Sequence, residues 1–184
     1  MQGEKGDWIE TFTGTKIYPL SPNIKDIHIE DIAHALSLIC RYNGHCSSYY
    51  SVAQHSVYVS DIVAPEFALQ GLLHDAAEAY IGDVPRPIKK MIPMFGDIER
   101  VCMSTISRKY SLPQAFDESI WVADNIMLAT EVSSFGMNLD KDWNLKEKPC
   151  DIVIEYWDPE TAEDNFLYKF NSLRHFIHVA FDAC

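Results

Sequence analysis

Apolar side chains recur at helical spacing along most of this 184-residue chain, and that periodicity predicts a bundle of helices. The pattern is clearest over residues 29–42, where one face carries Ile29, Ile32, Ala33, Leu36, Ile39 and Cys40. Similar patterns follow over 65–82, about 97–110 and about 113–135. Proline-rich residues 83–93 predict a constrained loop or short turns between two of these helices.

Residues at the ends of these segments predict where the helices begin and stop. Ser51 can cap a helix that carries His55. Pro65 and Gly82 mark the start and the end of the next helix. An Asp-Pro-Glu sequence opens a last helix over residues 158–182, because it supplies a cap, a proline at the first position and an acid in the first turn.

The first 22 residues follow a different pattern. Two short extended runs flank a Thr-Gly-Thr turn, which predicts a small β-hairpin within residues 1–22, and Pro19 places its second strand at an edge. No repeat, low-complexity tract or second domain is evident. We therefore predict an all-α single domain over residues 1–184, with an N-terminal hairpin, a helical core over 29–135 and a C-terminal helix.

Composition excludes several classes of protein. The formal charge of −12 argues against a large nucleic-acid surface, which is usually basic. The acidic excess is uneven, since no acid lies between Asp31 and Asp61, and this stretch can still accept an anion. Five cysteines without a CxxC pair are typical of reduced thiols in a cytosol. With no signal segment and no apolar run of ~20 residues, we expect a cytoplasmic protein that does not bind a membrane.

One motif combines an imidazole with carboxylates in apolar surroundings. His74 and Asp75 are adjacent on a predicted buried helix, where side chains about 100° apart can both reach one ion. Glu78 returns to the same face one turn later and can orient a water or move its proton. Asp83 follows the Gly82 turn, which can bring it back toward the same place. Buried charges need a partner, and either a cation or an Asp–His hydrogen bond would supply one.

Two further candidate ligands lie in other predicted helices. They are His55 and Asp124, each of which, taken alone, is better explained as a satisfied core residue, so only the joint pattern makes them candidates. Two histidines and two aspartates together can hold a divalent cation and leave positions open for water and substrate. This mixture of imidazole and carboxylate suits Zn²⁺, Mn²⁺, Fe²⁺ or Co²⁺. The helical core over 29–135 is therefore predicted to bind a metal ion.

The order of these residues along the chain resembles the motif of the HD-domain phosphohydrolase superfamily: His55, then His74-Asp75, then Asp124. The string HDAAEAYIGDVPRPIK over residues 74–89 is more specific, and it is similar to the bacterial 5′-deoxynucleotidase branch of that superfamily. Three more strings extend the likeness over nearly the whole chain: DIAHALS (31–37), CRYNGH (40–45) and YSVAQHS (50–56). They resemble a compact group of bacterial and phage HD hydrolases, which includes dATP triphosphohydrolases.

The resemblance implies an HD-domain helical bundle that hydrolyses a deoxyribonucleotide with a divalent metal ion (Zn²⁺, Mn²⁺ or Co²⁺, with Mg²⁺ as a candidate second ion). By position, it implies the metal ligands His55, His74, Asp75 and Asp124 and the catalytic residues Glu78 and Asp83. It further implies a homo-oligomer in a bacterial cytosol or that of a phage-infected host.

Three functions compete. The phage-like strings and the short segment of 18 residues between His55 and His74 favour hydrolysis of dATP to deoxyadenosine and tripolyphosphate. The first alternative is a 5′-deoxynucleotidase that releases phosphate from deoxynucleoside monophosphates. The second is a non-catalytic nucleotide-binding sensor. Glu78 and Asp83 argue against the sensor, because neither is needed merely to hold a metal.

A nucleotide also needs cationic groups for its phosphate. Arg41 lies in the acid-free stretch, and Arg86 and Lys89 follow Asp83 in the densest basic cluster of the chain. Guanidinium groups match phosphate oxygens, although a solvated basic surface is the alternative explanation. His45 is a candidate phosphate contact or, alternatively, a cap for the preceding Asn-Gly turn.

The nucleobase needs a flat apolar pocket. Candidates on the predicted hairpin are Ile17, Tyr18 and Pro19, by loose analogy with related dATP hydrolases. Ordinary packing of the hairpin on the bundle is the alternative.

Overall fold

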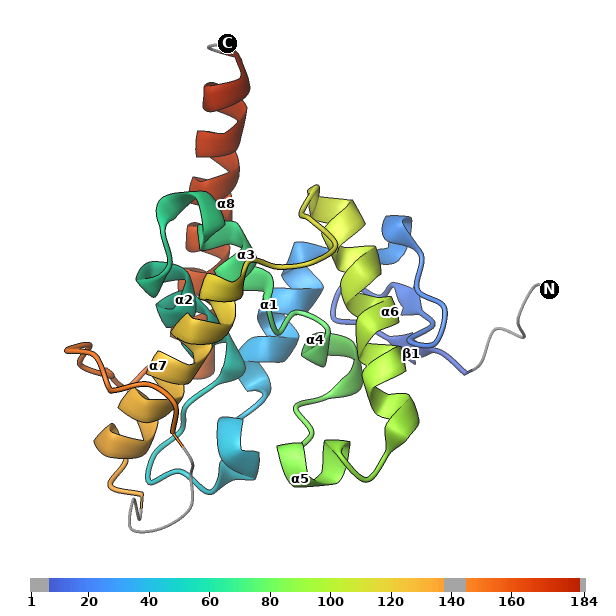
Figure 1. Ribbon diagram of the computed structural model, residues 1–184. Helices are drawn as coiled ribbons and strands as arrows, with labels where there is room; N and C mark the ends of the chain where they lie inside the picture. The colour runs from blue at the N-terminus through green and yellow to red at the C-terminus, as the bar shows by residue number, and fades with distance from the viewer. Residues whose placement is uncertain (1–6, 138–144, 183–184) are drawn as a thin grey trace.

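The computed structural model describes residues 7–137 and 145–182 and has a helical bundle with one small sheet (Figure 1). Strands β1 (Ile9–Glu10) and β2 (Lys16–Ile17) pair antiparallel. The helices are η1 (Ile24–Asp26), α1 (Ile29–Leu38), η2 (Arg41–Gly44), α2 (Val52–Ile62), η3 (Pro65–Phe67), α3 (Ala68–Leu73), α4 (Glu78–Ile81), α5 (Arg86–Lys89), α6 (Pro93–Tyr110), α7 (Glu118–Ser134) and α8 (Pro159–Asp182). The predicted all-α fold with a small N-terminal hairpin is confirmed, although residues 1–6 of the hairpin segment lie outside the described residues.

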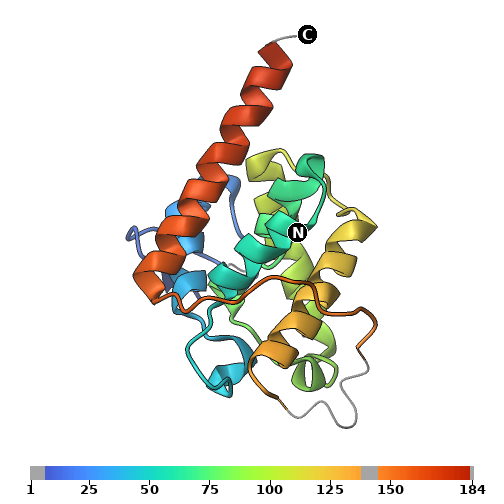
Figure 2. The ribbon, with the colours of Figure 1, turned by 90° about the vertical axis from the view of Figure 1, so that its left-hand side faces the viewer.

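Helix α2 lies inside the bundle and packs against α1, α3, α7 and α8. It begins as the sequence predicts, because the hydroxyl of Ser51 accepts a hydrogen bond from the N–H of Gln54 (3.1 Å). Residues 52–60 are all buried, so His55 lies inside the bundle. Figures 1 and 2 show α8 alongside this core, with its C-terminal end extending past the other helices.

Helices α2 and α3 approach each other closely at Gly71. A Cβ at this position would lie 3.1 Å from the Cα of Ser60 and 3.2 Å from Cγ2 of Val63. The hydroxyl of Ser60 also donates to the carbonyl of Ala68 across the same interface (2.7 Å). The end of α3, just before His74, is therefore fixed against the helix that carries His55.

Helix α1 ends earlier than predicted. The pattern over 29–42 indicates a helix throughout, but the structure ends it at Leu38 and continues with extended backbone. The reason is a short antiparallel pairing: the N–H of Val52 bonds to Ile39 O (3.0 Å) and the N–H of Arg41 bonds to Tyr50 O (2.9 Å). This pairing places Arg41 beside the start of α2.

The helix predicted over 65–82 is also interrupted. Helix α3 ends at Leu73, residues 74–77 form a turn, and α4 begins at Glu78. Bonds across three residues hold the turn, from Ala76 N to Leu73 O (3.1 Å) and from Glu78 N to Asp75 O (2.9 Å). His74 and Asp75 therefore lie in a tight turn between two short helices rather than within one continuous helix.

The later helices agree more closely with prediction. Helix α6 begins at Pro93, about one turn before the predicted start, with proline at its first position. Helix α8 begins as expected, because a carboxylate oxygen of Asp158 accepts from the N–H of Thr161 (2.8 Å). Within the described residues, no helix combines the length and the apolar character that a membrane span requires.

Candidate metal centre

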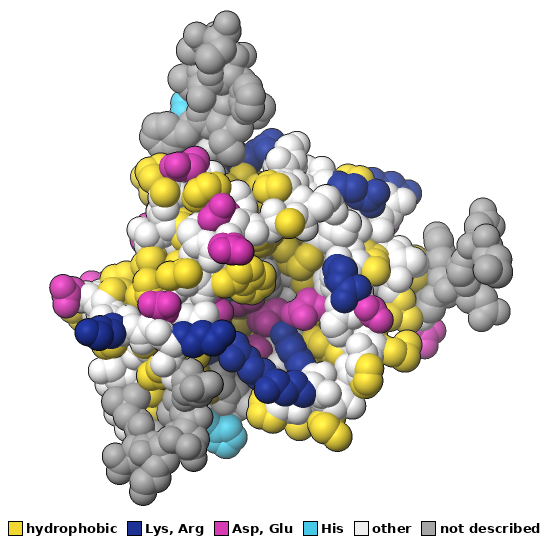
Figure 3. Space-filling view, in the orientation of Figure 1, with side chains coloured by type: hydrophobic (Ala, Val, Ile, Leu, Met, Phe, Trp, Pro, Cys, Tyr) yellow, Lys and Arg dark blue, Asp and Glu magenta, His cyan; other side chains and the backbone are white. Residues whose placement is uncertain are grey.

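A cavity of about 1200 Å³ opens on the face of the molecule shown in Figure 3, where acidic side chains lie at its floor and Lys and Arg side chains lie along its rim. Residues from η2, α4, α5, α6 and α7 line it, together with residues from the segments before α4, between α4 and α5 and between α6 and α7. Eight of the residues predicted from the sequence are among them: Arg41, His74, Asp75, Glu78, Asp83, Arg86, Lys89 and Asp124.

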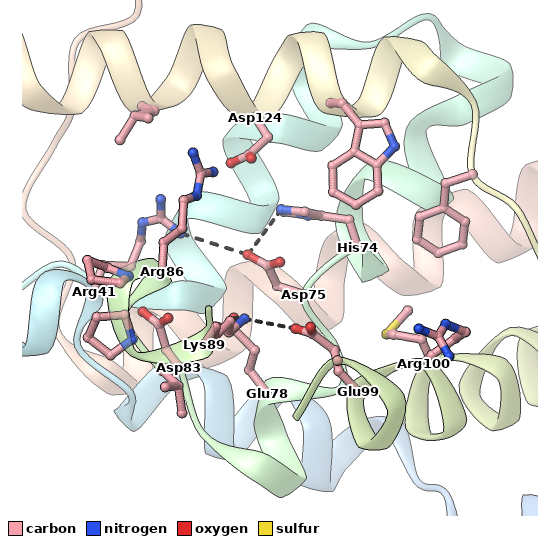
Figure 4. A pocket seen from close by; sticks show the side chains of 18 of the residues that line it. Arg41, His74, Asp75, Glu78, Asp83, Arg86, Lys89, Glu99, Arg100 and Asp124 are labelled. Atoms are coloured by element: carbon pink, nitrogen blue, oxygen red, sulfur yellow. Dashed lines mark hydrogen bonds and ion pairs between the residues drawn. The ribbon is translucent and has the colours of Figure 1, made fainter. Parts of the chain in front are cut away.

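The four predicted metal ligands converge. Ligand atoms of His55, His74 and Asp124 lie within 4.8 Å of one another. Asp75 Oδ2 is 3.0 Å from Nε2 of His74 and 3.9 Å from Nε2 of His55, and Asp124 Oδ1 is 3.2 Å from Nε2 of His55. Figure 4 shows His74, Asp75 and Asp124 pointing toward one another. Ligands about 2.1 Å from a tetrahedral ion lie about 3.4 Å apart, so this spacing suits one cation.

The hydrogen bonds of the two rings also suit a cation. Nδ1 of His74 donates to the carbonyl of Gly71 (2.8 Å), and Nδ1 of His55 donates to a carboxylate oxygen of Glu131 (2.6 Å). Neither Nε2 atom has a hydrogen-bond partner among the described residues, although both are buried. A ring that donates through Nδ1 can present the lone pair of Nε2 to a metal. These side chains therefore fit a divalent cation.

The charged groups around His55 and Asp75 shift the pKa values of both. Burial and Arg41 lower the pKa of His55, but Glu131 and Asp124 outweigh them and raise it to about 9. Burial alone would raise the pKa of Asp75, yet the adjacent His74 draws it well below its usual range. Three carboxylates thus surround one imidazole, and the cluster attracts positive charge.

Glu131 was not among the residues predicted from the sequence. It lies on α7, and its side chain is fully buried. Oε1 accepts from Nδ1 of His55 and from the hydroxyl of Tyr50 (2.9 Å). Oε2 accepts from Nε of Arg41 (3.2 Å) and from the hydroxyl of Tyr42, and it lies 3.2 Å from Nη2 of Arg41 in an ion pair. One carboxylate therefore joins a metal-ligand candidate to a guanidinium group of the cavity.

The sequence contained one signal for this residue. Glu131 follows Asp124 by seven residues, which is about two helical turns and places both on one face of α7. Burial would raise the pKa of Glu131, but Arg41 and His55 lower it further than burial raises it. Glu131 is therefore an anion that the positive groups around it stabilise.

The two predicted catalytic acids both reach the cavity. Glu78 begins α4, and its Oε2 is buried without a hydrogen-bond partner in the described structure. Burial, followed by repulsion from Asp75 and Asp83, raises the pKa of Glu78 to about 10. Burial likewise raises the pKa of Asp83. Nζ of Lys89 lies 3.5 Å from Glu78 Oε1 and 2.8 Å from Glu99 Oε1, so Lys89 is already paired with acids.

Arg41 enters the cavity from the loop that contains η2. Besides its bonds to Glu131, its Nη1 lies 3.8 Å from Asp75 Oδ2. The next two residues, Tyr42 (φ 56°) and Asn43 (φ 51°), both have left-handed backbone, which is strained for tyrosine. The bond from the Tyr42 hydroxyl to Glu131 helps to hold this conformation. The loop thereby fixes Arg41 at the edge of the metal-ligand cluster (Figure 4).

Four residues predicted to contact the substrate do not line this cavity. Ile17 is fully buried in the core, so its side chain is not available to a base, and the carbonyl of Pro19 accepts from Sγ of Cys102 (3.2 Å). Tyr18 also lies outside the cavity lining. For these three hairpin residues the alternative, packing on the bundle, describes the structure better. His45 is exposed, and its N–H bonds to Tyr42 O (2.9 Å), as expected for a turn cap.

Apolar side chains that line the cavity come instead from other segments. One group comes from the segment between α4 and α5 and from the start of α5 and comprises Val84, Pro85 and Pro87. A second group comes from α6, α7 and the segment between them and comprises Met103, Phe116, Trp121 and Leu128. Their positions in sequence give no hint that they share a cavity, because only the tertiary fold places α6 and α7 around the same cavity.

Fold and site together define a helical protein whose histidine–carboxylate cluster can hold a metal ion. No protein-family model matches the chain. The uncharacterized protein YfdR of Escherichia coli (strain K12) is 44% identical to it over 169 residues, which cover 90% of this chain and 95% of YfdR. An uncharacterized protein of Rhodobacter capsulatus is 33% identical over 165 residues, 84% of this chain and 83% of that protein. The chain belongs to the same protein family as YfdR; neither relative's name states an activity.

Proposed function

We propose that this chain is a metal-dependent phosphohydrolase of the HD-domain superfamily that acts on a deoxyribonucleotide. The observation that carries the proposal is the convergence of His55, His74 and Asp124 from three separate segments. Asp75 adds a fourth ligand, and Glu78 adds a buried acid beside the group. A protein that merely stores a cation has no need of that last carboxylate.

The proposed cofactor is Zn²⁺, Mn²⁺ or Co²⁺, because two imidazoles and two carboxylates suit these ions. A divalent cation at this position would supply Lewis-acid activation of water near neutral pH and would offset negative charge on phosphoryl oxygens. Its ligands would be His55, His74, Asp75 and Asp124.

The protein's own groups would handle the proton and the phosphate. Next to a cation, the pKa of Glu78 falls below its value of about 10, so its carboxylate can accept a proton from the attacking water. Asp83 faces the same space and can pass that proton on. Arg41 and Arg86 offer guanidinium donors to phosphoryl oxygens, where charge grows in the transition state.

We propose dATP as the substrate, cleaved to deoxyadenosine and tripolyphosphate. The volume of about 1200 Å³ exceeds that of most small-molecule sites, so a triphosphate can be accommodated. Apolar side chains at both sides of the cavity offer surfaces for a base. A 5′-deoxynucleotidase would use the same residues on a monophosphate, and product analysis separates the two.

The experiment is to incubate the purified chain with Mn²⁺ or Co²⁺ and either dATP or dAMP, and to identify the products by ion chromatography. Tripolyphosphate from dATP supports the proposal. Orthophosphate released from dAMP alone identifies the monophosphatase instead. If no nucleotide among the four deoxynucleoside triphosphates and their monophosphates is cleaved, the hydrolase proposal is wrong.

A further inference from the structure

Glu131 lies behind the metal-ligand cluster. It contacts both His55, which would face the cation, and Arg41, which would face a phosphate. We propose that Glu131 is a positioning residue, which fixes the metal-binding nitrogen of His55 and the cavity guanidinium of Arg41 at the same time. The inference rests on the proposed function, because it assumes that a cation binds at Nε2 of His55.

The first argument is the number of donors that Glu131 satisfies. Its two oxygens accept four hydrogen bonds, one each from Arg41, Tyr42, Tyr50 and His55. Nη2 of Arg41 adds an ion pair. A carboxylate offers about four lone-pair positions, so its capacity is filled. Glu131 is fully buried, and these protein groups satisfy its carboxylate in place of water.

The second argument concerns the His55 ring. A carboxylate can only accept, so the hydrogen bond of 2.6 Å requires a proton on Nδ1. That proton leaves Nε2, which has no hydrogen-bond partner, as the nitrogen that faces Asp75 and Asp124. Removing the acceptor would allow the proton to move to Nε2, where it would exclude a metal.

The third argument concerns Arg41. The carboxylate oxygen that does not hold His55 binds Nε and Nη2 of this guanidinium, and Nη1 then lies 3.8 Å from Asp75. Arg41 therefore has a fixed orientation before any substrate arrives. A change at Glu131 would disturb the cation and the phosphate together, although Glu131 is not among the residues that line the cavity.

Replacement by glutamine tests this mechanism, because the side chain keeps its shape but one oxygen becomes an NH₂ group. In one orientation that NH₂ would face the donors of Arg41 and Tyr42. In the other it would face Nδ1 of His55 and favour a proton on Nε2. The matched control is Tyr50→Phe, which removes one donor from the same oxygen and leaves the carboxylate in place.

The experiment titrates Co²⁺ into the full chain and follows binding by calorimetry and by the visible spectrum of the bound ion. Glu131→Gln is expected to weaken Co²⁺ binding by about 10- to 100-fold and to change the spectrum. The Co²⁺ affinity of Tyr50→Phe is expected to stay within about threefold of the wild-type affinity, because Glu131 still accepts the hydrogen bond from Nδ1 of His55 in this variant. Binding of inorganic phosphate to the Co²⁺-loaded chain is expected to weaken in Glu131→Gln as well.

The outcomes separate this inference from the proposed function. If Glu131→Gln binds Co²⁺ with the affinity and the spectrum of the wild type, the positioning role is overturned and the proposed function is not. A wild type that takes up neither Co²⁺ nor Zn²⁺ overturns the metal site itself. If Glu131→Gln does not fold, NMR of the Zn²⁺-loaded wild type decides: a protonated Nδ1 on His55 supports the role, and an unprotonated Nδ1 overturns it.

Discussion

Gly71 of α3 lies against the backbone of Ser60 in α2, so closely that a methyl group on Gly71 would come within 3.1 Å of the Ser60 Cα. The carbonyl of Gly71 also accepts the hydrogen bond from Nδ1 of His74. Helix α2 carries His55. The contact therefore sets the distance between the segments that supply both histidines.

Replacing Gly71 with alanine should push α2 and α3 apart. The added methyl group meets backbone atoms of Ser60, which cannot move as a flexible side chain can, so we expect a loss of about 1–3 kcal/mol in the free energy of unfolding. Urea denaturation measures the loss. Gly96→Ala is the control: it lies within α6, nothing is within 4 Å of its added Cβ, and a gain of about 0.5–1 kcal/mol is expected. Equal effects from the two changes would contradict the packing argument.

Asp124→Asn should remove a metal ligand without removing volume. Because a ligand that binds only the folded state raises its stability, Co²⁺ should raise the melting temperature of the wild type but not of the variant. Differential scanning calorimetry with and without Co²⁺ measures this shift. Glu118→Gln, an exposed acid at the start of the same helix, should behave as the wild type. A full Co²⁺ shift in Asp124→Asn would exclude Asp124 as a ligand.

Glu78→Gln should distinguish the enzyme from a nucleotide sensor. We expect nucleotide turnover to fall by at least about 100-fold while Co²⁺ binding stays within a few-fold, because the role proposed for Glu78 is proton transfer and not metal ligation. Burial raises the pKa of Glu78 to about 10 in the folded state. Above the unfolded pKa of glutamate, this shift costs folding free energy, because the unfolded chain ionises more readily. Glutamine does not ionise, so the variant should be no less stable than the wild type at pH 7. Glu99→Gln, which removes the charge of another acid in the cavity, is the control for turnover. Full turnover in Glu78→Gln would exclude the proton-transfer role.

The start of α8 should show a pH-dependent stability. Hydrogen bonds from the N–H and side chain of Thr161 lower the pKa of Asp158 in the folded state. A lowered folded pKa means that the stabilisation is present above the unfolded value of about 3.9 and is lost as the pH falls through the folded value.

Asp158→Ala should therefore be less stable than the wild type at pH 6, and the difference should shrink as the pH falls below about 3.9. Asp158→Asn caps helices without titrating and is the matched control. Urea denaturation at several pH values measures both. A difference between Asp158→Ala and the wild type that does not change with pH would contradict this account.

Local chemistry explains what could be predicted without coordinates. The helical periodicity, the caps at Ser51 and Asp158 and the small N-terminal hairpin all follow from neighbouring residues, and the structure confirms them. The convergence of His55, His74 and Asp124 was also predicted, from the joint pattern of histidines and aspartates and from its resemblance to HD-domain hydrolases.

Tertiary contacts decided the rest. Helix α1 stops at Leu38 because residues 39–41 pair with the start of α2, and local periodicity cannot register a competing backbone partner from another segment. The hairpin residues Ile17, Tyr18 and Pro19 were candidates for a base pocket, with packing on the bundle as the alternative. Ile17 is enclosed in the core, and none of the three lines the cavity.

The sequence by itself determined most of the helical segments, because periodicity and caps depend on residues within a few positions of each other, and its motifs identified the candidate ligands. Only the tertiary structure decided that Glu131 serves both His55 and Arg41, and that α6 and α7 supply the apolar wall of the cavity. The physical reason is that both features depend on which helix faces meet, and packing of the whole bundle sets those contacts.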